Sequence, residues 1–163
     1  MERQSKIGFI MGHFAPLHRG HQFLIETALY DMDRVVVLVY DRPDLTPIPL
    51  SVRANWIRKL YPGIEVIEGA DCPKEFGSEA RIMKLHKDYI RRKITAKITH
   101  VYSNEQYGGE ISEVFSAENV VVDARRERVP ISGTAIRENP ERYRSMVEPL
   151  VFEDMMKHVS PSS

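Results

Sequence analysis

Two histidines near the amino terminus have the residue type and spacing for chemistry on a phosphate. His18 and His21 flank Gly20 within residues 12–21, whose sequence is Gly-His-Phe-Ala-Pro-Leu-His-Arg-Gly-His. Imidazoles donate hydrogen bonds to a phosphoryl oxygen as negative charge develops on it, and an ordinary histidine pKa of about 6.5 is tunable near neutrality. Pro16 stiffens the stretch, and Gly20 lets the backbone come close to a ligand.

The place of this stretch in the chain favours an anion. It lies between an apolar run at residues 7–11 and an amphipathic segment at residues 22–31, a pattern that predicts a turn from a buried strand into a helix. A helix that begins there adds unpaired backbone N–H groups and a partial positive charge. The alternative is that His18 only caps the turn and His21 only occupies the first helical turn.

A second stretch, residues 131–137, has the residues of another anion site. Its sequence is Ile-Ser-Gly-Thr-Ala-Ile-Arg. Ser132 or Thr134 can cap a helix whose free N–H groups face a phosphate, and Arg137 lies within reach of the same anion. The alternative is an ordinary helix cap with a surface arginine.

Together, the two stretches resemble the motifs of the HxGH nucleotidyltransferase superfamily, whose members transfer a nucleotidyl group from ATP or CTP to a phosphate or an alcohol. Residues 12–21 are similar to the HxGH signature, and residues 131–137 resemble the ISTxxR motif, which binds the triphosphate in that superfamily. The resemblance implies that His18, His21 and Arg137 are catalytic. It implies ATP contacts for a larger set of residues, namely Gly12, His13, Phe14, Gly20, Asp123, Arg126, Ser132, Gly133 and Thr134.

A narrower resemblance covers most of the chain. Residues 131–143 are similar to the end of the nicotinamide mononucleotide (NMN) adenylyltransferase domain of NadR-type NAD-biosynthesis proteins, and Val122-Asp123-x-x-Arg126 also fits that group. It implies that AMP moves from Mg-ATP to NMN by direct in-line attack, which gives NAD and pyrophosphate. His18 and His21 would then hold the α-phosphate, and Arg137 the β- and γ-phosphates. Mg²⁺ would be held mainly by phosphate oxygens and water, so we expect no metal site made of protein ligands.

For the acceptor we expect contacts from Asp41, Arg53, Trp56 and Tyr107. Arg53 and Trp56 fit the NadR-type pattern in the helix after a proline-rich loop. Trp56 falls on the apolar face of that helix, so a place in the core is the alternative.

The chain departs from the family pattern in three respects. Residues 75–90 contain no tryptophan, whereas the family has tryptophans there on the nicotinamide side. His13 stands where many members have arginine or lysine, so we expect phosphate binding at this position to depend on pH. No Walker phosphate loop is present, so we do not expect the kinase activity of the NadR-type proteins.

The pattern of the remaining chain predicts the frame for these residues. Apolar runs indicate strands at residues 7–11, 35–40, 64–67, 98–103 and 119–122. Helical spacing indicates helices at residues 22–31, 51–61, 78–94 and 110–115, the second of them capped by Ser51. This alternation predicts an α/β fold with a Rossmann-like, doubly wound, five-stranded parallel sheet. We expect one domain over residues 1–163, with the core at about 5–148 and a C-terminal helix and frayed tail at 149–163.

Composition narrows the partners. The 163 residues include 23 basic and 23 acidic side chains, so the formal charge is zero and nothing favours nucleic acid or an anionic membrane as a partner. Cys72 is the single cysteine, which excludes an internal disulfide and fits a reducing compartment. With no secretory signal and no apolar run near the ~20 residues of a membrane span, we expect a cytoplasmic protein. The sequence leaves the oligomeric state open.

Two other functions remain open at this stage. The chain could be an adenylyl- or cytidylyltransferase for another acceptor, such as phosphopantetheine, FMN or a polyol phosphate. It could also be a sensor that binds a nucleotide without turnover, although a sensor has no need of groups that stabilise a transition state.

Overall fold

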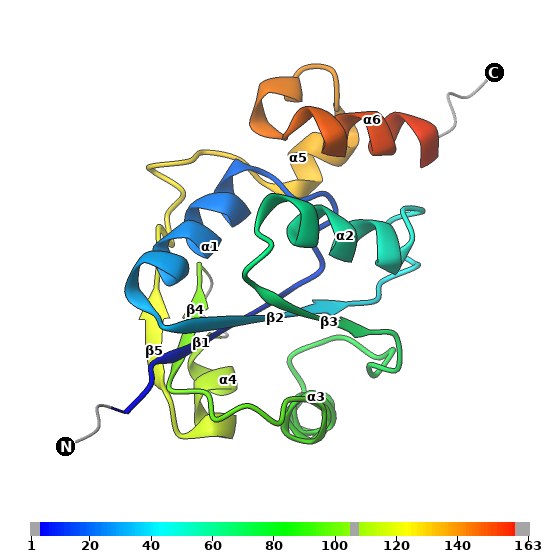
Figure 1. Cartoon of the computed structure of the whole chain (residues 1–163). Coiled ribbons are helices and arrows are strands. Elements are labelled where there is room, and N and C mark those ends of the chain that lie inside the picture. Colours follow the sequence, from blue (N-terminus) through cyan, green and yellow to red (C-terminus); the bar gives the residue numbers. More distant parts are fainter. Residues whose placement is uncertain (1–3, 105–107, 159–163) are drawn as a thin grey trace.

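The computed structural model describes residues 4–104 and 108–158 and contains a sheet with helices on both faces (Figure 1). The strands are β1 (Ile7–Gly12), β2 (Arg34–Tyr40), β3 (Glu65–Gly69), β4 (His100–Ser103) and β5 (Glu118–Val121). The helices are α1 (Arg19–Asp31), α2 (Leu50–Leu60), α3 (Ala80–Lys93), α4 (Gly108–Phe115), α5 (Gly133–Glu138) and α6 (Pro149–His158). A short 3-10 helix, η1 (Arg144–Met146), precedes α6.

The sheet is parallel throughout, with the strand order β3-β2-β1-β4-β5. β1 lies at its centre, where Gly8 pairs with Val35 of β2 on one side and with His100 of β4 on the other. The chain builds outward from β1 to β3 and then returns to place β4 beside β1. In doubly wound sheets, a crevice opens beyond the carboxyl ends of the strands at such a reversal.

The interior strand β2 shows why both faces of the sheet are covered. Residues 35–40 are at most 3% exposed, and successive strand residues point to opposite faces. Val37 belongs to a core cluster with residues of α1, α2 and α6, whereas Leu38 belongs to a second cluster with residues of α3 and α4. Figure 1 accordingly shows α1 and α2 on one side of the sheet and α3 and α4 on the other.

The expected fold class is confirmed, while several element bounds differ from the prediction. α1 begins at Arg19 and not at residue 22, because His18 already caps it. α2 begins at Leu50 with Pro49 at its cap position, so the prediction that Ser51 caps this helix is wrong. Of the expected C-terminal helix and frayed tail at residues 149–163, the part after residue 158 lies outside the described residues. None of the described helices combines the length and apolar character needed to cross a membrane.

Candidate functional site

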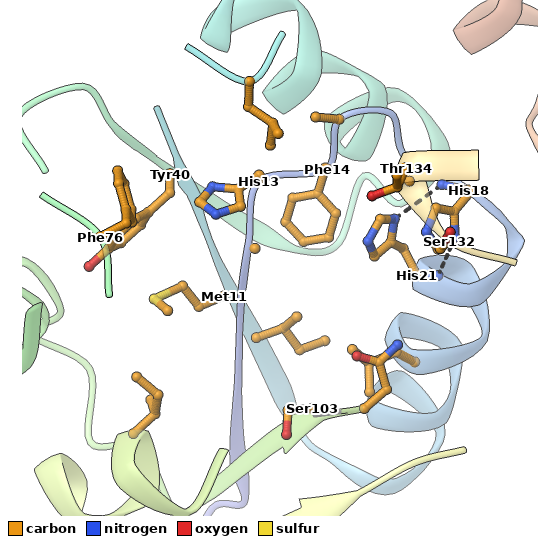
Figure 2. A pocket seen from close by; sticks show the side chains of 18 of the residues that line it. Met11, His13, Phe14, His18, His21, Tyr40, Phe76, Ser103, Ser132 and Thr134 are labelled. Atoms are coloured by element: carbon orange, nitrogen blue, oxygen red, sulfur yellow. Dashed lines mark hydrogen bonds between the residues drawn. The ribbon is translucent and has the colours of Figure 1, made fainter. Parts of the chain in front are cut away.

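A cavity of about 440 Å³ lies beyond the carboxyl ends of β1 and β4, where the strand order reverses. One end of it, here called the polar end, is lined by His18, His21, Thr134, Arg126 and Arg137. The other end, called the aromatic end, is lined by His13, Tyr40, Phe76 and His86. Figure 2 shows the polar end on the right and the aromatic end on the left, with Phe14 between them.

At the polar end, both motif histidines use one ring nitrogen to hold the start of α1. His18 is the N-cap, and its Nδ1 accepts from the backbone N–H groups of Gly20 at 3.0 Å and His21 at 3.4 Å. The Nδ1 of His21 accepts in return from the backbone N–H of His18 at 3.2 Å. Because Nδ1 accepts in both rings, a neutral imidazole carries its proton on Nε2. Capping therefore fixes both rings as Nε2–H donors.

The two rings and Gly20 are tightly packed. The imidazoles of His18 and His21 stack with their centroids 3.7 Å apart. Gly20 itself does not line the cavity, but a Cβ at this position would lie 2.9 Å from Cε1 of His18. A side chain at residue 20 would therefore push the His18 ring out of its capping position.

Both motif histidines are neutral at pH 7. Burial, followed by the charges of Arg126 and Arg137, lowers the pKa of His18 to about 4. Burial and the neighbouring His18 hold the pKa of His21 well below its ordinary value. In the folded chain both pKa values thus lie well below the ordinary 6.5, because the rings are desolvated among guanidinium groups. The positive charge of the polar end comes from its arginines.

The second motif docks directly onto the first. Ser132 caps α5, and its Oγ accepts from the N–H of Ala135 at 3.2 Å. Arg137 donates from Nη1 to the carbonyl of Ala15 at 2.6 Å and from Nη2 to Oγ1 of Thr134 at 3.2 Å. A Cβ at Gly133 would lie 3.0 Å from that Nη1, so glycine permits this close approach. Two stretches far apart in the sequence therefore share one cavity.

Ten of the predicted ATP-site residues line the cavity, whereas two of them do not. The ten are Gly12, His13, Phe14, His18, His21, Arg126, Ser132, Gly133, Thr134 and Arg137. Gly20 and Asp123 lie outside the lining. Each of these two instead shapes the backbone next to a residue that does line it.

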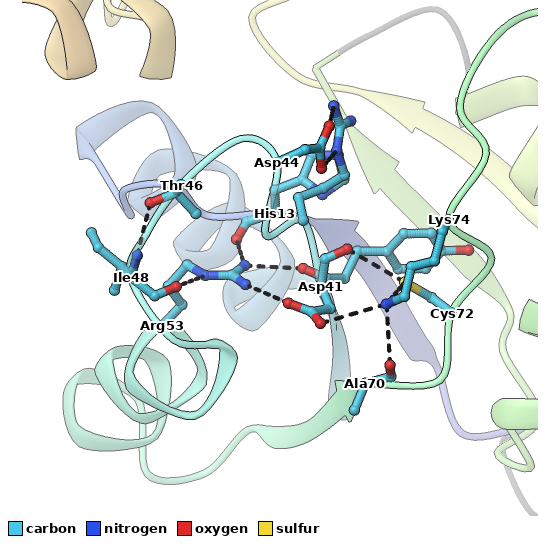
Figure 3. Close-up of polar contacts among 11 residues, drawn as sticks. His13, Asp41, Asp44, Thr46, Ile48, Arg53, Ala70, Cys72 and Lys74 are labelled. Carbon is cyan, nitrogen blue, oxygen red and sulfur yellow. Dashed lines mark hydrogen bonds and ion pairs between the residues drawn. The ribbon is translucent and has the colours of Figure 1, made fainter. Parts of the chain in front are cut away.

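The acceptor prediction agrees less well with the structure. Arg53 is 0% exposed and donates to the backbone carbonyls of Ile48 at 3.1 Å, His13 at 2.5 Å and Tyr40 at 3.0 Å (Figure 3). Asp41 accepts from Arg53 and from Lys74. Because these contacts use the donors of a buried guanidinium, Arg53 organises the backbone beneath the aromatic end and lies outside the cavity lining. Asp41 is likewise absent from that lining.

The structure describes one of the two further acceptor candidates. Trp56 is 1% exposed within the core, and its Nε1 donates to Asp154 of α6 at 2.7 Å. The core alternative for Trp56 is thus the one that the structure shows. Tyr107 lies outside the described residues.

The aromatic end contains residues that the sequence analysis missed. Phe76 comes from the loop before α3, and its ring lies 5.8 Å from His13 and 5.2 Å from His86 between centroids. The guanidinium of Arg42 lies 4.0 Å from the Phe76 centroid. The sequence signal for this residue was that Phe76 is the one aromatic side chain in the loop before α3.

A relay of hydrogen bonds holds the aromatic end in place. Nε2 of His86 lies 2.7 Å from the carbonyl oxygen of Glu75, which can only accept, so this nitrogen carries the proton. Nδ1 of a neutral His86 then accepts from the hydroxyl of Tyr40, at 3.1 Å. The carbonyl bond fixes the backbone next to Phe76. The relay therefore orients the Phe76 ring at the cavity.

His13 differs from Tyr40 and His86 at the aromatic end in its hydrogen bonding. Among the described residues, its Nδ1 is the buried side-chain nitrogen or oxygen that lacks a hydrogen-bond partner. Burial, followed by the charges of Arg42 and Arg53, lowers the pKa of His13 to about 4. Any titration of this residue in the free protein therefore lies well below neutral pH, and the expected pH dependence of phosphate binding at His13 stays a prediction.

A metal centre made by the protein needs a cluster of several side-chain ligands. Within residues 4–104 and 108–158, no group of three or more histidine, cysteine, aspartate and glutamate side chains could hold a metal ion.

Comparisons with known proteins agree with this geometry. The sequence model of a family described as cytidylyltransferase-like matches residues 9–139. The chain is 29% identical over 160 residues to the trifunctional NAD biosynthesis/regulator protein NadR of Escherichia coli (strain K12), which covers 86% of this chain and 38% of that protein. The chain therefore spans well under half the length of that relative.

Other relatives are named for different acceptors. A probable nicotinate-nucleotide adenylyltransferase of Thermotoga maritima is 27% identical, with 95% of this chain and 91% of that protein covered. A phosphopantetheine adenylyltransferase of Fusobacterium nucleatum is 31% identical, with 68% and 71% covered. The crystal structure of NadR in complex with NAD and AMP-PNP superimposes with a TM-score of 0.63 at 23% identity, over 90% of this chain and 46% of that one, which shows a shared fold.

Proposed function

The chain belongs to the cytidylyltransferase-like family of nucleotidyltransferases, and from this premise we propose that it moves AMP from Mg-ATP to NMN, giving NAD and pyrophosphate. The observation that carries the proposal is the convergence of His18, His21 and Arg137 on one cavity that also has an aromatic end. The NMN half of the product has a matching layout, with a phosphate at one end and a flat ring at the other.

The polar end supplies the chemistry. The acceptor phosphate attacks the α-phosphorus of ATP in line, its oxygen forms the new P–O bond, and pyrophosphate leaves. The Nε2–H groups of His18 and His21 donate to the α-phosphate oxygens as their charge grows, and Arg137 with Thr134 binds the departing phosphates. Since there is no covalent enzyme intermediate, positioning and charge stabilisation provide the acceleration. Mg²⁺ held by the ATP phosphates and by water would neutralise part of the phosphate charge.

The aromatic end suits the nicotinamide ring of the acceptor. Phe76 offers a ring face, and His13 and Tyr40 close the space around it. Offset and edge-to-face contacts between aromatic rings contribute about 0.5–1.5 kcal/mol beyond the buried area. We therefore assign to Phe76 the part that the missing tryptophans of residues 75–90 would have played.

A second acceptor is favoured by one specific observation. The relative at 31% identity is a phosphopantetheine adenylyltransferase, and the polar end is equally suited to any adenylyl transfer. The acceptors differ at the aromatic end, because phosphopantetheine has no ring to stack on Phe76. Nicotinate mononucleotide is a third acceptor of the same shape as NMN.

One assay tests the proposal. NMN and Mg-ATP are incubated with the chain, and NAD is read out by an NAD-dependent dehydrogenase, while pyrophosphate release is followed with ATP or CTP and a panel of phosphorylated acceptors. We expect ATP-dependent NAD formation with NMN. Pyrophosphate release with phosphopantetheine alone would favour the second acceptor, and nucleotide binding with no release from any acceptor would favour a sensor.

A further inference from the structure

The loop between β5 and α5 is organised around one carboxylate. Asp123 follows β5, and its Oδ1 accepts from the backbone N–H groups of Glu127 at 2.9 Å and Arg128 at 3.0 Å. Its Oδ2 accepts from the N–H of Val129 at 3.0 Å. The hydrogen bond from the backbone of Arg128 contributes most to lowering the pKa of Asp123, so Asp123 is ionised at neutral pH. One side chain thereby closes seven residues into a compact turn.

Arg126 occupies the tip of this turn. Its backbone N–H donates to the carbonyl of Asp123 at 2.8 Å. Its φ of 54° is a backbone conformation that residues other than glycine rarely adopt without support. Its Nη1 donates to the carbonyl of Ile131 at 2.6 Å, immediately before the cap of α5. Arg126 lines the cavity, whereas Asp123 does not.

The guanidinium groups of Arg126 and Arg137 both line the polar end of the cavity, and both act on His18. Both charges contribute to the lowered pKa of His18, which means that both lie near its ring. They reach this place by separate tethers, because Arg137 is held by the carbonyl of Ala15 and by Thr134. The polar end thus has two cations, each fixed by its own set of hydrogen bonds.

We propose that Asp123 is a positioning residue that acts through Arg126, and that this pair holds one side of the nucleotide polyphosphate while Arg137 holds the other. This inference rests on the proposed function, because it takes the ligand of the polar end to be a nucleoside triphosphate. Asp123 touches no ligand. Its three N–H bonds fix the backbone that aims the Arg126 guanidinium, and a cation held in place before binding costs less entropy when the phosphate arrives.

The test is a double-mutant cycle read out by ATP binding, with no acceptor present. Calorimetry with a non-hydrolysable ATP analogue gives Kd for the wild-type chain, Asp123→Ala, Arg126→Ala and the double variant. We expect each single variant to bind about tenfold more weakly, as is typical for one charge-assisted contact, and the double variant also about tenfold more weakly. Asp123→Asn, which keeps one acceptor oxygen, should fall between the wild-type chain and Asp123→Ala.

Two controls separate positioning from general damage to the fold. Glu127→Ala removes an exposed carboxylate from the same loop but keeps its backbone donor, and we expect an unchanged Kd. Asp123→Ala combined with Arg137→Ala should weaken binding by the product of the two single effects, because Arg137 has its own tether. Circular dichroism and Tm confirm that each variant is folded.

Three results would overturn the inference. The first is wild-type affinity in Asp123→Ala, and the second is a loss of about a hundredfold in the Asp123 and Arg126 double variant, which would show independent action. A wild-type chain that binds neither ATP nor CTP analogues is the third, and it alone contradicts the proposed function as well. The outcomes therefore distinguish a wrong positioning role from a wrong activity.

Discussion

The two ends of the cavity are built in different ways. Most of the polar end comes from two contiguous stretches, residues 12–21 and 131–137, in which local hydrogen bonds set each ring and cap, and Arg126 is added from the loop before the second stretch. The aromatic end gathers single residues from the turn after β1, the end of β2, the loop before α3 and α3 itself. Phosphate recognition can be encoded in a short motif, because it uses backbone and neighbouring side chains. Ring recognition here depends on packing between distant elements.

Charge divides the two ends in a second way. His13 and His18 lie at opposite ends, and burial lowers the pKa of each to about 4. At the polar end, the nearby cations Arg126 and Arg137 line the cavity. At the aromatic end, Arg53 is buried behind the lining and Arg42 is engaged with Asp44 at 2.9 Å. A neutral imidazole therefore lies beside lining arginines at the polar end, where it is His18, and beside aromatic rings at the aromatic end, where it is His13.

The largest expected effect is on turnover at the polar end. His21→Gln should lower kcat for NAD formation by about 10²–10³-fold, as loss of one oxyanion donor does, while the glutamine side chain can still complete the capping box. His18→Asn is the matched variant, since asparagine is a good N-cap without an imidazole. Steady-state kinetics give kcat for both variants, and Tm shows whether each variant is folded. Turnover near the wild-type value in a folded His21→Gln chain would remove His21 from the mechanism.

The next effect concerns the support of the aromatic end. Arg53→Met should lower the free energy of unfolding by about 3 kcal/mol, because it leaves three buried carbonyl oxygens without their donor. Arg58→Met on the same helix is the control, since Arg58 is a partly exposed residue in a surface ion pair and should cost under about 1 kcal/mol. Urea unfolding gives both values. Equal losses would show that Arg53 has no organising part.

A pH measurement compares one histidine from each end. His13 and His18 have folded pKa values of about 4 against about 6.5 when unfolded, so the unfolded chain binds more protons between these values. Stability is therefore fully present above about pH 6.5 and is lost as the pH falls toward 4. We expect each residue to contribute about 2 kcal/mol to the loss between pH 7 and 5. Urea unfolding of His13→Asn and His18→Asn should show a correspondingly smaller pH dependence, and an unaltered slope in either would mean that this ring is already solvated.

The smallest expected effect is on KM, and it distinguishes NMN from ATP. Phe76→Leu should raise KM for NMN about tenfold and leave KM for ATP within about twofold, since only the acceptor ring meets Phe76. Phe76→Trp keeps a ring face and should restore a KM near the wild-type value. A parallel rise in both KM values would instead place Phe76 in the general support of the cavity.

The success of the sequence analysis follows the same division. The strands and the two motifs were predictable because apolar runs and capping residues act over a few positions, as in β2 and at His18. Arg53 and Trp56 were assigned to the acceptor because they fit a family pattern, but burial engages both side chains in internal hydrogen bonds. Phe76 and His86 were missed because a lone aromatic and a lone histidine carry no spacing signal. Which residues act on a ligand stays a prediction for the assays above.

By itself, the sequence determined the parallel α/β sheet, because apolar runs act over neighbouring residues. It predicted residues 12–21 and 131–137 as anion sites, because their capping residues, glycines and cations are close together in the chain. Only the tertiary structure decided that His18 and Arg137 share a cavity, that Asp123 supports Arg126, and that Phe76 meets His13. The physical reason is that these relations depend on strand order and on burial. Strand order brings distant segments to one edge of the sheet, and burial decides which polar groups remain available to a ligand.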